Sequence, residues 1–225
     1  MEPRGNYTGH VEPGGAPTRR ELDALTITKV SVGPMDNNAY LLVCRRTGDA
    51  LLIDAANDAE RLADLLGHDD QRPRLRTIVT THRHQDHWQA LGSVAGQTGC
   101  YTVAHPDDAE GLPVPADRTV EHGESVQVGE SALEVIHLRG HTPGSIALLY
   151  RDPVGHPHLF TGDSLFPGGV GKTNSEQDFR SLLDDVQNRV FAVLPDDTWV
   201  YPGHGDDTTL GAERPKLAEW RERGW

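Results

Sequence analysis

Seven imidazole and carboxylate side chains of this sequence are spaced in a way that strongly restricts its fold. Four of them lie within six consecutive residues, directly after the apolar run at 77–80, and three follow far downstream, each directly after a glycine. Two adjacent divalent metal ions can be held by such a set when one carboxylate bridges them. Only a fold that returns residue 204 to residue 82 can use the whole set. The candidate ligands are His82, His84, Asp86, His87, His141, Asp163 and His204.

The local spacing of the first four candidates indicates two neighbouring metal positions. Alternate side chains of an extended segment point to the same side, so His82 and His84 can reach one ion. Asp86 and His87 then fall at the start of the next helix, which Asp86 is placed to cap, and turn toward a second position. The set has nitrogen and oxygen donors but no thiolate, which favours Zn(II) and also accepts Fe(II) or Mn(II).

This donor set predicts hydrolytic chemistry on a small molecule. Two such ions share a water, lower its pKa toward about 7 and hold a substrate carbonyl oxygen. Asp86 is the carboxylate best placed to orient that water, so we expect it to be catalytic. The glycine before each of the three later ligands lets the backbone approach a crowded centre.

The order of apolar patterns predicts an α/β domain with two sheets. Strand-like runs alternate with helical spacing in both halves of the chain, and no linker of disordered composition separates the halves. We expect a flexible Gly- and Pro-rich tail at 1–20 and one domain at 21–225. Strands are expected at 25–30, 39–43, 50–54, 76–80, 100–104, 125–128, 132–138, 145–150, 158–161 and 198–201, and helices at 58–66, from 86 to 96 or 99, at 177–191 and at 210–221.

The composition argues against two classes of partner. A formal net charge of −13 repels phosphate backbones and anionic lipids, so we expect neither nucleic acid nor a membrane as partner. Cys44 and Cys100 are too few for a disulfide framework and are expected to be buried free thiols, which suits the reducing cytoplasm. We expect no signal peptide, because the first residues lack the charged-then-apolar layout. The oligomeric state stays open.

The H-x-H-x-D-H pattern at 82–87, together with the three later ligands, resembles the metallo-β-lactamase superfamily, most closely its glyoxalase II branch. The resemblance extends from about residue 30 to about residue 212 and implies a four-layer αββα sandwich. Many true β-lactamases of the superfamily carry cysteine at the position of Asp163, which argues against antibiotic hydrolysis. The resemblance implies His82, His84 and His141 on one metal, Asp86, His87 and His204 on the other, and Asp163 as the bridge.

The same resemblance implies one substrate contact. Glyoxalase II enzymes place a basic residue in a Gly-Cys-Gly-Lys-like turn, where it contacts a carboxylate of the thiol carrier. The segment 169–172 occupies that position, so Lys172 is a candidate substrate-binding residue, with a solvated loop lysine as the alternative. The tyrosine that follows in glyoxalase II is Asn174 here, and the residues after His204 suffice for one helix rather than the helical domain that grips glutathione. The sequence therefore leaves the thiol carrier open.

Two reaction classes fit these residues. The first is hydrolysis of a thioester or a similar activated ester. The second is that of the iron-dependent persulfide dioxygenases, which the sequence also resembles and which would hold one iron on His82, His141 and Asp163. Those enzymes tend to carry Arg and Asp where Lys172 and Asn174 stand, which favours the hydrolase. A lactonase is chemically adjacent and stays open, whereas the acidic charge disfavours nucleic-acid processing.

Overall fold

The computed structural model describes residues 4–67 and 73–224 of the chain. Its first sheet has eight strands in sequential order, antiparallel from β1 to β5 and parallel from β5 to β8. The strands are β1 Arg4–Gly5, β2 Thr18–Glu21, β3 Leu25–Val32, β4 Asn37–Cys44, β5 Asp49–Ile53, β6 Arg74–Val79, β7 Tyr101–Ala104 and β8 Arg118–Thr119.

The second sheet has six strands in the order β16-β15-β12-β11-β10-β9, and β12 and β15 run parallel within it. β9 shows why these segments form strands: Val126 and Val128 are buried and alternate with exposed Ser125 and Gln127, the period of a half-buried strand. The strands are β9 Ser125–Val128, β10 Ser131–His137, β11 Ile146–Tyr150, β12 His158–Gly162, β15 Trp199–Pro202 and β16 Thr208–Thr209, and a separate hairpin pairs β13 Leu165–Phe166 with β14 Gly169–Val170.

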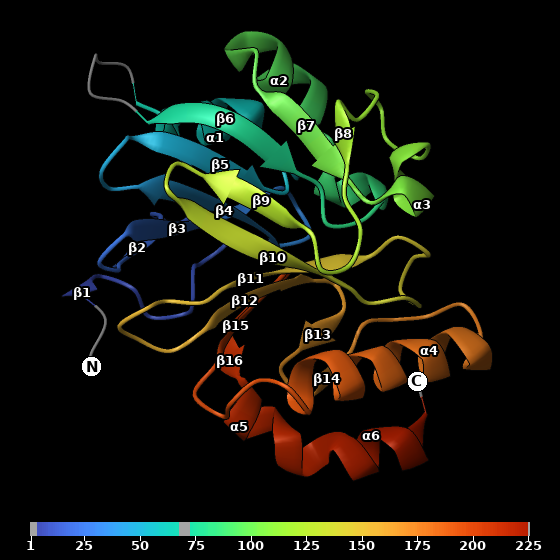
Figure 1. The fold of residues 1–225 in the computed structure, drawn as a ribbon. Coiled ribbons are helices and arrows are strands. Elements are labelled where there is room, and N and C mark those ends of the chain that lie inside the picture. Colours follow the sequence, from blue (N-terminus) through green and yellow to red (C-terminus); the bar gives the residue numbers. More distant parts are fainter. Residues whose placement is uncertain (1–3, 68–72, 225) are drawn as a thin grey trace.

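The two sheets face each other, and helices cover their outer faces (Figure 1). Apolar side chains of both sheets form the central core, with Leu42 on one side and Leu148 on the other. The expected αββα sandwich is therefore confirmed. Helices α1 Ala59–Leu65 and α2 Leu91–Thr98 pack on the first sheet, and α4 Glu176–Asp185, α5 Leu210–Glu213 and α6 Leu217–Arg223 pack on the second, while α3 Pro106–Ala109 follows β7.

The prediction of a flexible tail at 1–20 is wrong for the residues that the structure describes there. Residues 4–5 and 18–21 form strands β1 and β2 of the first sheet, and Tyr7 and Val11 are buried. The Arg20 guanidinium lies 4.0 Å from the ring centroid of Trp199. The low hydropathy of this segment gives no sign of its packing, because only a few large side chains fix a long polar segment. Residues 1–3 lie outside the described part.

The helix expected from residue 86 begins later. Asp86 lies in a single 3₁₀ turn, Gln85–His87, and α2 begins at Leu91 with Ala90 at its N-cap and no capping side chain. The expected cap is therefore wrong, and the Asp86 carboxylate is available for another role. The helix ends at Thr98, followed by Gly99 in the left-handed conformation that favours glycine.

The two C-terminal helices are each divided. The segment after α4 continues as a π-helix, Val186–Phe191, so the expected single helix changes its hydrogen bonding midway. Pro215 lies in a 3₁₀ segment, Arg214–Lys216, between α5 and α6. Proline lacks the backbone donor that a continuous helix needs there, which explains the break.

Both thiols are free, and Cys44 is buried whereas Cys100 is half-buried. Over residues 4–67 and 73–224, no helix combines the length and the apolar character needed to cross a membrane.

Candidate metal centre

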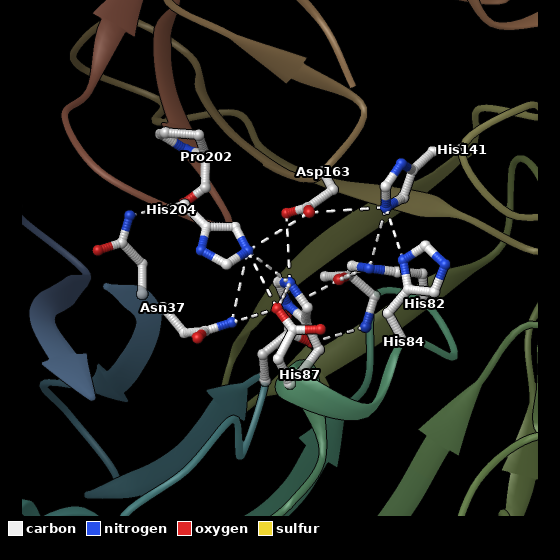
Figure 2. A network of polar contacts seen from close by, with 12 residues as sticks. Asn37, His82, His84, His87, His141, Asp163, Pro202 and His204 are labelled. Atoms are coloured by element: carbon white, nitrogen blue, oxygen red, sulfur yellow. Dashed lines mark hydrogen bonds and ion pairs between the residues drawn. The ribbon is translucent and has the colours of Figure 1, made fainter. Parts of the chain in front are cut away.

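All seven candidate ligands meet at one edge of the sandwich (Figure 2). The strands β6, β10, β12 and β15 each end shortly before a ligand, so four carboxyl-terminal strand ends supply the whole set. β12 and β15 are parallel neighbours in which Gly162 pairs with Pro202. Asp163 and His204 therefore leave the second sheet side by side. The fold does return residue 204 to the run that begins at residue 82.

His82, His84 and His141 form the first ligand group. Nδ1 of His84 lies 2.9 Å from Nε2 of His141, which lies 3.3 Å from Nε2 of His82. Burial, followed by the neighbouring His87, holds the pKa of His82 well below its usual value. His82 is therefore neutral, the form in which an imidazole binds a metal.

Asp86, His87 and His204 form the second ligand group. Nε2 of His204 lies 3.2 Å from Nε2 of His87 and 3.3 Å from Oδ2 of Asp86. Partial burial acts to raise the pKa of Asp86, but the Asn37 amide, His87 and His204 outweigh it and lower the pKa. Asp86 is therefore an ionised carboxylate at neutral pH.

Asp163 lies between the two groups. Its Oδ2 lies 3.5 Å from Nε2 of His141 and 3.4 Å from Nε2 of His204, and its Oδ1 lies 3.3 Å from Nε2 of His87. Burial raises the pKa of Asp163, but His87 and His204 outweigh burial and hold the pKa well below its usual value. The Asp163 carboxylate therefore lies within ion-pair distance of histidines from both ligand groups.

The donor set fits two metal ions. Nδ1–H of His141 donates to the Lys172 carbonyl at 2.7 Å, and Nδ1–H of His204 donates to the Met35 carbonyl at 2.9 Å. In its neutral form, each ring therefore turns an unprotonated Nε2 toward the other ligands. Oδ1 of Asp163 is buried and has no hydrogen-bond partner among the residues that the structure describes. Lone pairs that face one another at this range, beside a buried carboxylate oxygen that accepts no hydrogen bond from the described residues, are satisfied by cations.

Asp54, which the sequence analysis did not single out, fixes the ligand run, the segment 82–87 that carries the first four candidate ligands. This buried residue follows β5 directly and accepts hydrogen bonds from the backbone N–H and hydroxyl of Thr81, at 2.7 and 2.8 Å. Its Oδ2 also lies 2.9 Å from Nδ1 of His87. Burial lowers the pKa of His87, but Asp163 and Asp54 outweigh burial and raise it to about 10. The two carboxylates thus favour positive charge at this point of the site.

A second unpredicted carboxylate, Asp108 in α3, joins the first ligand run to the His141 loop. It is buried and accepts hydrogen bonds from the Arg83 N–H at 3.0 Å and from the Gly144 N–H at 2.9 Å. The hydroxyl of Thr142 donates to the same carboxylate at 2.5 Å. Asp108 therefore fixes the segments that carry His84 and His141 relative to each other.

Asn37, at the start of β4, is a third functional residue that sequence reasoning missed. Its buried side-chain amide donates to Oδ2 of Asp86 at 2.9 Å and lies 3.4 Å from Nε2 of His204 (Figure 2). The amide therefore fixes the Asp86 carboxylate beside His204. No signal in the sequence separates this asparagine from Asn38 beside it.

Gly203 shows why glycine precedes a ligand. A side chain there would overlap Oδ1 of Asp163, and its Cβ would lie 2.7 Å from Cε1 of His87. Gly171 is packed against the Asp163 backbone in the same way. The prediction that small residues allow close backbone approach is confirmed at Gly203.

A hollow of about 410 Å³ opens beside the first ligand group, with His84 and His141 in its wall. Arg83 and Asn174 also line it. The side chain of Lys172 is exposed, and what the structure shows of this residue's role is its carbonyl bond to His141. Substrate binding by the Lys172 side chain stays a prediction.

Comparisons with known proteins agree with this geometry. The family model described as "Metallo-beta-lactamase superfamily" matches residues 32–204. A hydroxyacylglutathione hydrolase of Polaromonas sp. is 36% identical over 169 residues, which cover 75% of this chain and 62% of that relative.

Solved structures of similar fold extend the match. The BLEG-1 B3 metallo-beta-lactamase superposes with a TM-score of 0.75 at 28% identity, covering 84% of this chain and 96% of that one. ETHE1 from Myxococcus xanthus superposes with a TM-score of 0.74 at 29% identity, covering 86% of this chain and 84% of that one. TTHA1623, solved in a di-iron-bound form, superposes with a TM-score of 0.66 at 31% identity, covering 83% of this chain and 96% of that one. This chain belongs to the metallo-beta-lactamase superfamily.

Proposed function

We propose that the chain is a metal-dependent hydrolase that cleaves a small thioester at a dinuclear centre. The observation that carries this proposal is the place of Asp163, whose two carboxylate oxygens face histidines of both ligand groups. The similarity to a hydroxyacylglutathione hydrolase supports the same reaction class. Because that relative is matched over 62% of its length, its substrate is not carried over with the fold.

Each part of the site has a role in this reaction. His82, His84 and His141 would hold one ion, Asp86, His87 and His204 the other, and Asp163 both. Zinc is the metal we propose, and Fe(II) or Mn(II) suits the same donors. When bound, such a pair supplies a water of lowered pKa, near about 7, and polarises a carbonyl oxygen.

The chain itself positions the attacking water and the substrate. Asp86 is ionised, and Asn37 donates to its Oδ2, so Oδ1 would accept a hydrogen bond from the water and orient it. Asp54 and Asp108 keep the ligand loops fixed, so little reorganisation accompanies the reaction. The part of the substrate beyond the carbonyl would lie in the hollow beside His84 and His141.

The second candidate, a mononuclear iron dioxygenase, is less well supported. It would use His82, His141 and Asp163 alone. The structure also brings one ligand atom each of Asp86, His87 and His204 within 4.8 Å of one another. A complete second ligand group has a direct use in a dinuclear hydrolase.

One experiment separates these reactions. The chain, loaded in turn with Zn, Fe and Mn, is assayed with thioesters, matched oxygen esters of the same acyl groups, lactones and persulfides. We expect the fastest turnover on a thioester with two metals per chain. One iron per chain with oxygen uptake on a persulfide would overturn the proposal, and preference for a lactone would move the substrate to that class.

A further inference from the structure

A buried ion pair lies behind the loop that carries His204. Nζ of Lys29, on β3, lies 2.7 Å from Oδ1 of Asp207, and the side chains are 0% and 1% exposed. Lysine is rarely buried to this degree, because removing its charge from water is unfavourable. This position therefore calls for a reason beyond packing.

Every donor of the Lys29 ammonium is used, two of them by the His204 loop and one by the N-terminal segment. Besides Asp207, it donates to the Gly9 carbonyl at 2.9 Å and to the Gly205 carbonyl at 2.7 Å. Gly205 directly follows His204. The ammonium thus joins β3, the N-terminal segment and the His204 loop at one point.

The carboxylate of the pair is equally constrained. Oδ2 of Asp207 accepts hydrogen bonds from the Tyr7 hydroxyl and from Nε1–H of Trp199, the latter at 2.8 Å. The Asp207 N–H donates to the Gly9 carbonyl at 3.0 Å. Tyr7 and Gly9 belong to the segment predicted to be a flexible tail, so that segment closes over the His204 loop.

The other ligand loops show the same construction. Asp54 fixes the run at 81–87, and Asp108 fixes the segments around Arg83 and His141. Asp207 does this for the remaining histidine loop, with Lys29 as a further link to the Gly205 carbonyl. Asn38 adds a second bond to that carbonyl at 2.9 Å.

A purely stabilising role does not require charges here. A buried ion pair is often replaced by apolar residues without loss of stability, and its best-attested use is to fix one arrangement among several. An apolar pair in place of Lys29 and Asp207 would fill the space but would leave the Gly205 carbonyl without the ammonium.

We propose that Lys29, Asp207 and the N-terminal segment that bonds to them through Tyr7 and Gly9 are positioning elements for His204, and that they set the affinity of the second metal position. The inference rests on the proposed dinuclear centre. It assigns these residues no contact with substrate. The first metal position, formed by His82, His84 and His141, has its own anchors and stays intact when this network is weakened.

Metal titration of the full chain tests the inference. Apo protein is titrated with Co(II) and Zn(II), with stoichiometry from elemental analysis and the two binding steps from calorimetry and the visible Co(II) spectrum. Tyr7→Phe removes one hydrogen bond to Asp207 and should weaken the second step about three- to tenfold, with the first step unchanged. Lys29→Met should reduce the chain from two bound metals to one.

Tyr150→Phe is the control, because it removes the hydroxyl of another buried tyrosine, on β11 of the same core, that forms no hydrogen bond with Asp207. It should leave both binding steps unchanged. If Lys29→Met does not fold, Tyr7→Phe decides. Equal weakening of both steps, or no change in either, would overturn the inference.

The wild-type titration separates this inference from the proposed function. If the wild-type chain binds a single metal, both the proposed dinuclear centre and the inference are wrong. A chain that binds two metals and cleaves no thioester would remove only the proposed reaction.

Discussion

Oδ2 of Asp54 lies 2.9 Å from Nδ1 of His87, so a carboxylate at the end of one buried strand fixes a ligand that follows the next strand. β5 and β6 are parallel neighbours, which brings their carboxyl ends together. The same carboxylate accepts hydrogen bonds from the backbone N–H and the hydroxyl of Thr81, which directly precedes His82. The end of β5 therefore positions Thr81 and His87, on either side of the other ligands of this segment.

Asp54→Asn should weaken metal binding about 10- to 100-fold, as loss of a partner behind a metal ligand usually does. The amide keeps the shape but not the charge that orients His87. Competition with a chromophoric chelator measures the affinity. Asp49→Asn, the same change at the start of the same strand, is the control and should leave the affinity unchanged. Equal affinities of Asp54→Asn and wild type would refute the role.

Asp163→Ala and His84→Ala should abolish turnover and lower the metal content while the chain stays folded. Asp163 serves both ligand groups and His84 one, so the loss of metal should be larger for Asp163→Ala. Elemental analysis gives the metal content, and far-ultraviolet circular dichroism reports the fold. His122→Ala removes an exposed histidine and serves as control. Wild-type activity in either ligand variant would show the site assignment to be wrong.

Gly203→Ala should remove activity and bound metal, because the added methyl group overlaps Oδ1 of Asp163. Gly96→Ala is the contrasting control: Gly96 lies in α2 with open space where its Cβ would be. It should raise the free energy of unfolding by about 1 kcal/mol, because alanine favours helix over glycine. Urea unfolding and metal analysis measure both variants. A fully loaded Gly203→Ala chain would contradict the packing described around Asp163.

Asp185→Asn should lower the free energy of unfolding on the order of 1 kcal/mol at pH 7. Burial raises the pKa of Asp185, but its pair with Arg139, at 2.7 Å, outweighs burial and lowers the pKa from 3.8. A carboxyl whose folded pKa is depressed stabilises above its unfolded pKa, and this stability disappears as the pH falls through the folded pKa.

The gap between wild type and Asp185→Asn should therefore shrink below about pH 4, where urea unfolding of both chains is compared. Glu176→Gln, in an exposed pair with Arg180, should cost at most a few tenths of a kcal/mol at any pH. A gap that stays constant between pH 7 and pH 3 would rule out the ion pair as its source.

Lys172→Ala should raise KM for thioesters with an anionic carrier more than it lowers kcat, which is the pattern of lost uniform binding. Thioesters whose carrier carboxylate is replaced by a carboxamide should show no difference. Arg45→Ala, which removes an exposed cation directly after β4, is the control. An unchanged KM would show that Lys172 is a solvated loop lysine that does not bind the substrate.

Much of the fold follows from periodicity in the sequence. β9 was predicted with its observed bounds, because Val126 and Val128 alternate with polar residues. Strands of two residues, such as β8 and β16, carry no period and were missed. The N-terminal segment was misjudged because its order comes from contacts of Tyr7 and Arg20 with Trp199, which lies far away in the sequence.

The candidate ligands were predictable from residue type, spacing and flanking glycines, and their convergence is what the structure adds. The residues behind them were not predictable. Asp54 and Asp108 look like any other of the 34 acidic residues until the fold shows which loops they join. Asp86 was expected to cap a helix, and the 3₁₀ turn that holds it instead depends on tertiary packing.

Because the candidate ligands leave both sheets, with His82–His87 on one side of the central core and His141, Asp163 and His204 on the other, a loaded centre would act as a cross-link between the halves of the sandwich. Thermodynamic linkage then couples folding to supply of the ion. For each site that only the native chain offers, every tenfold rise in free ion above its dissociation constant adds about 1.4 kcal/mol to the unfolding free energy. A chelator would accordingly lower the melting temperature of this chain, even though its apolar core is untouched.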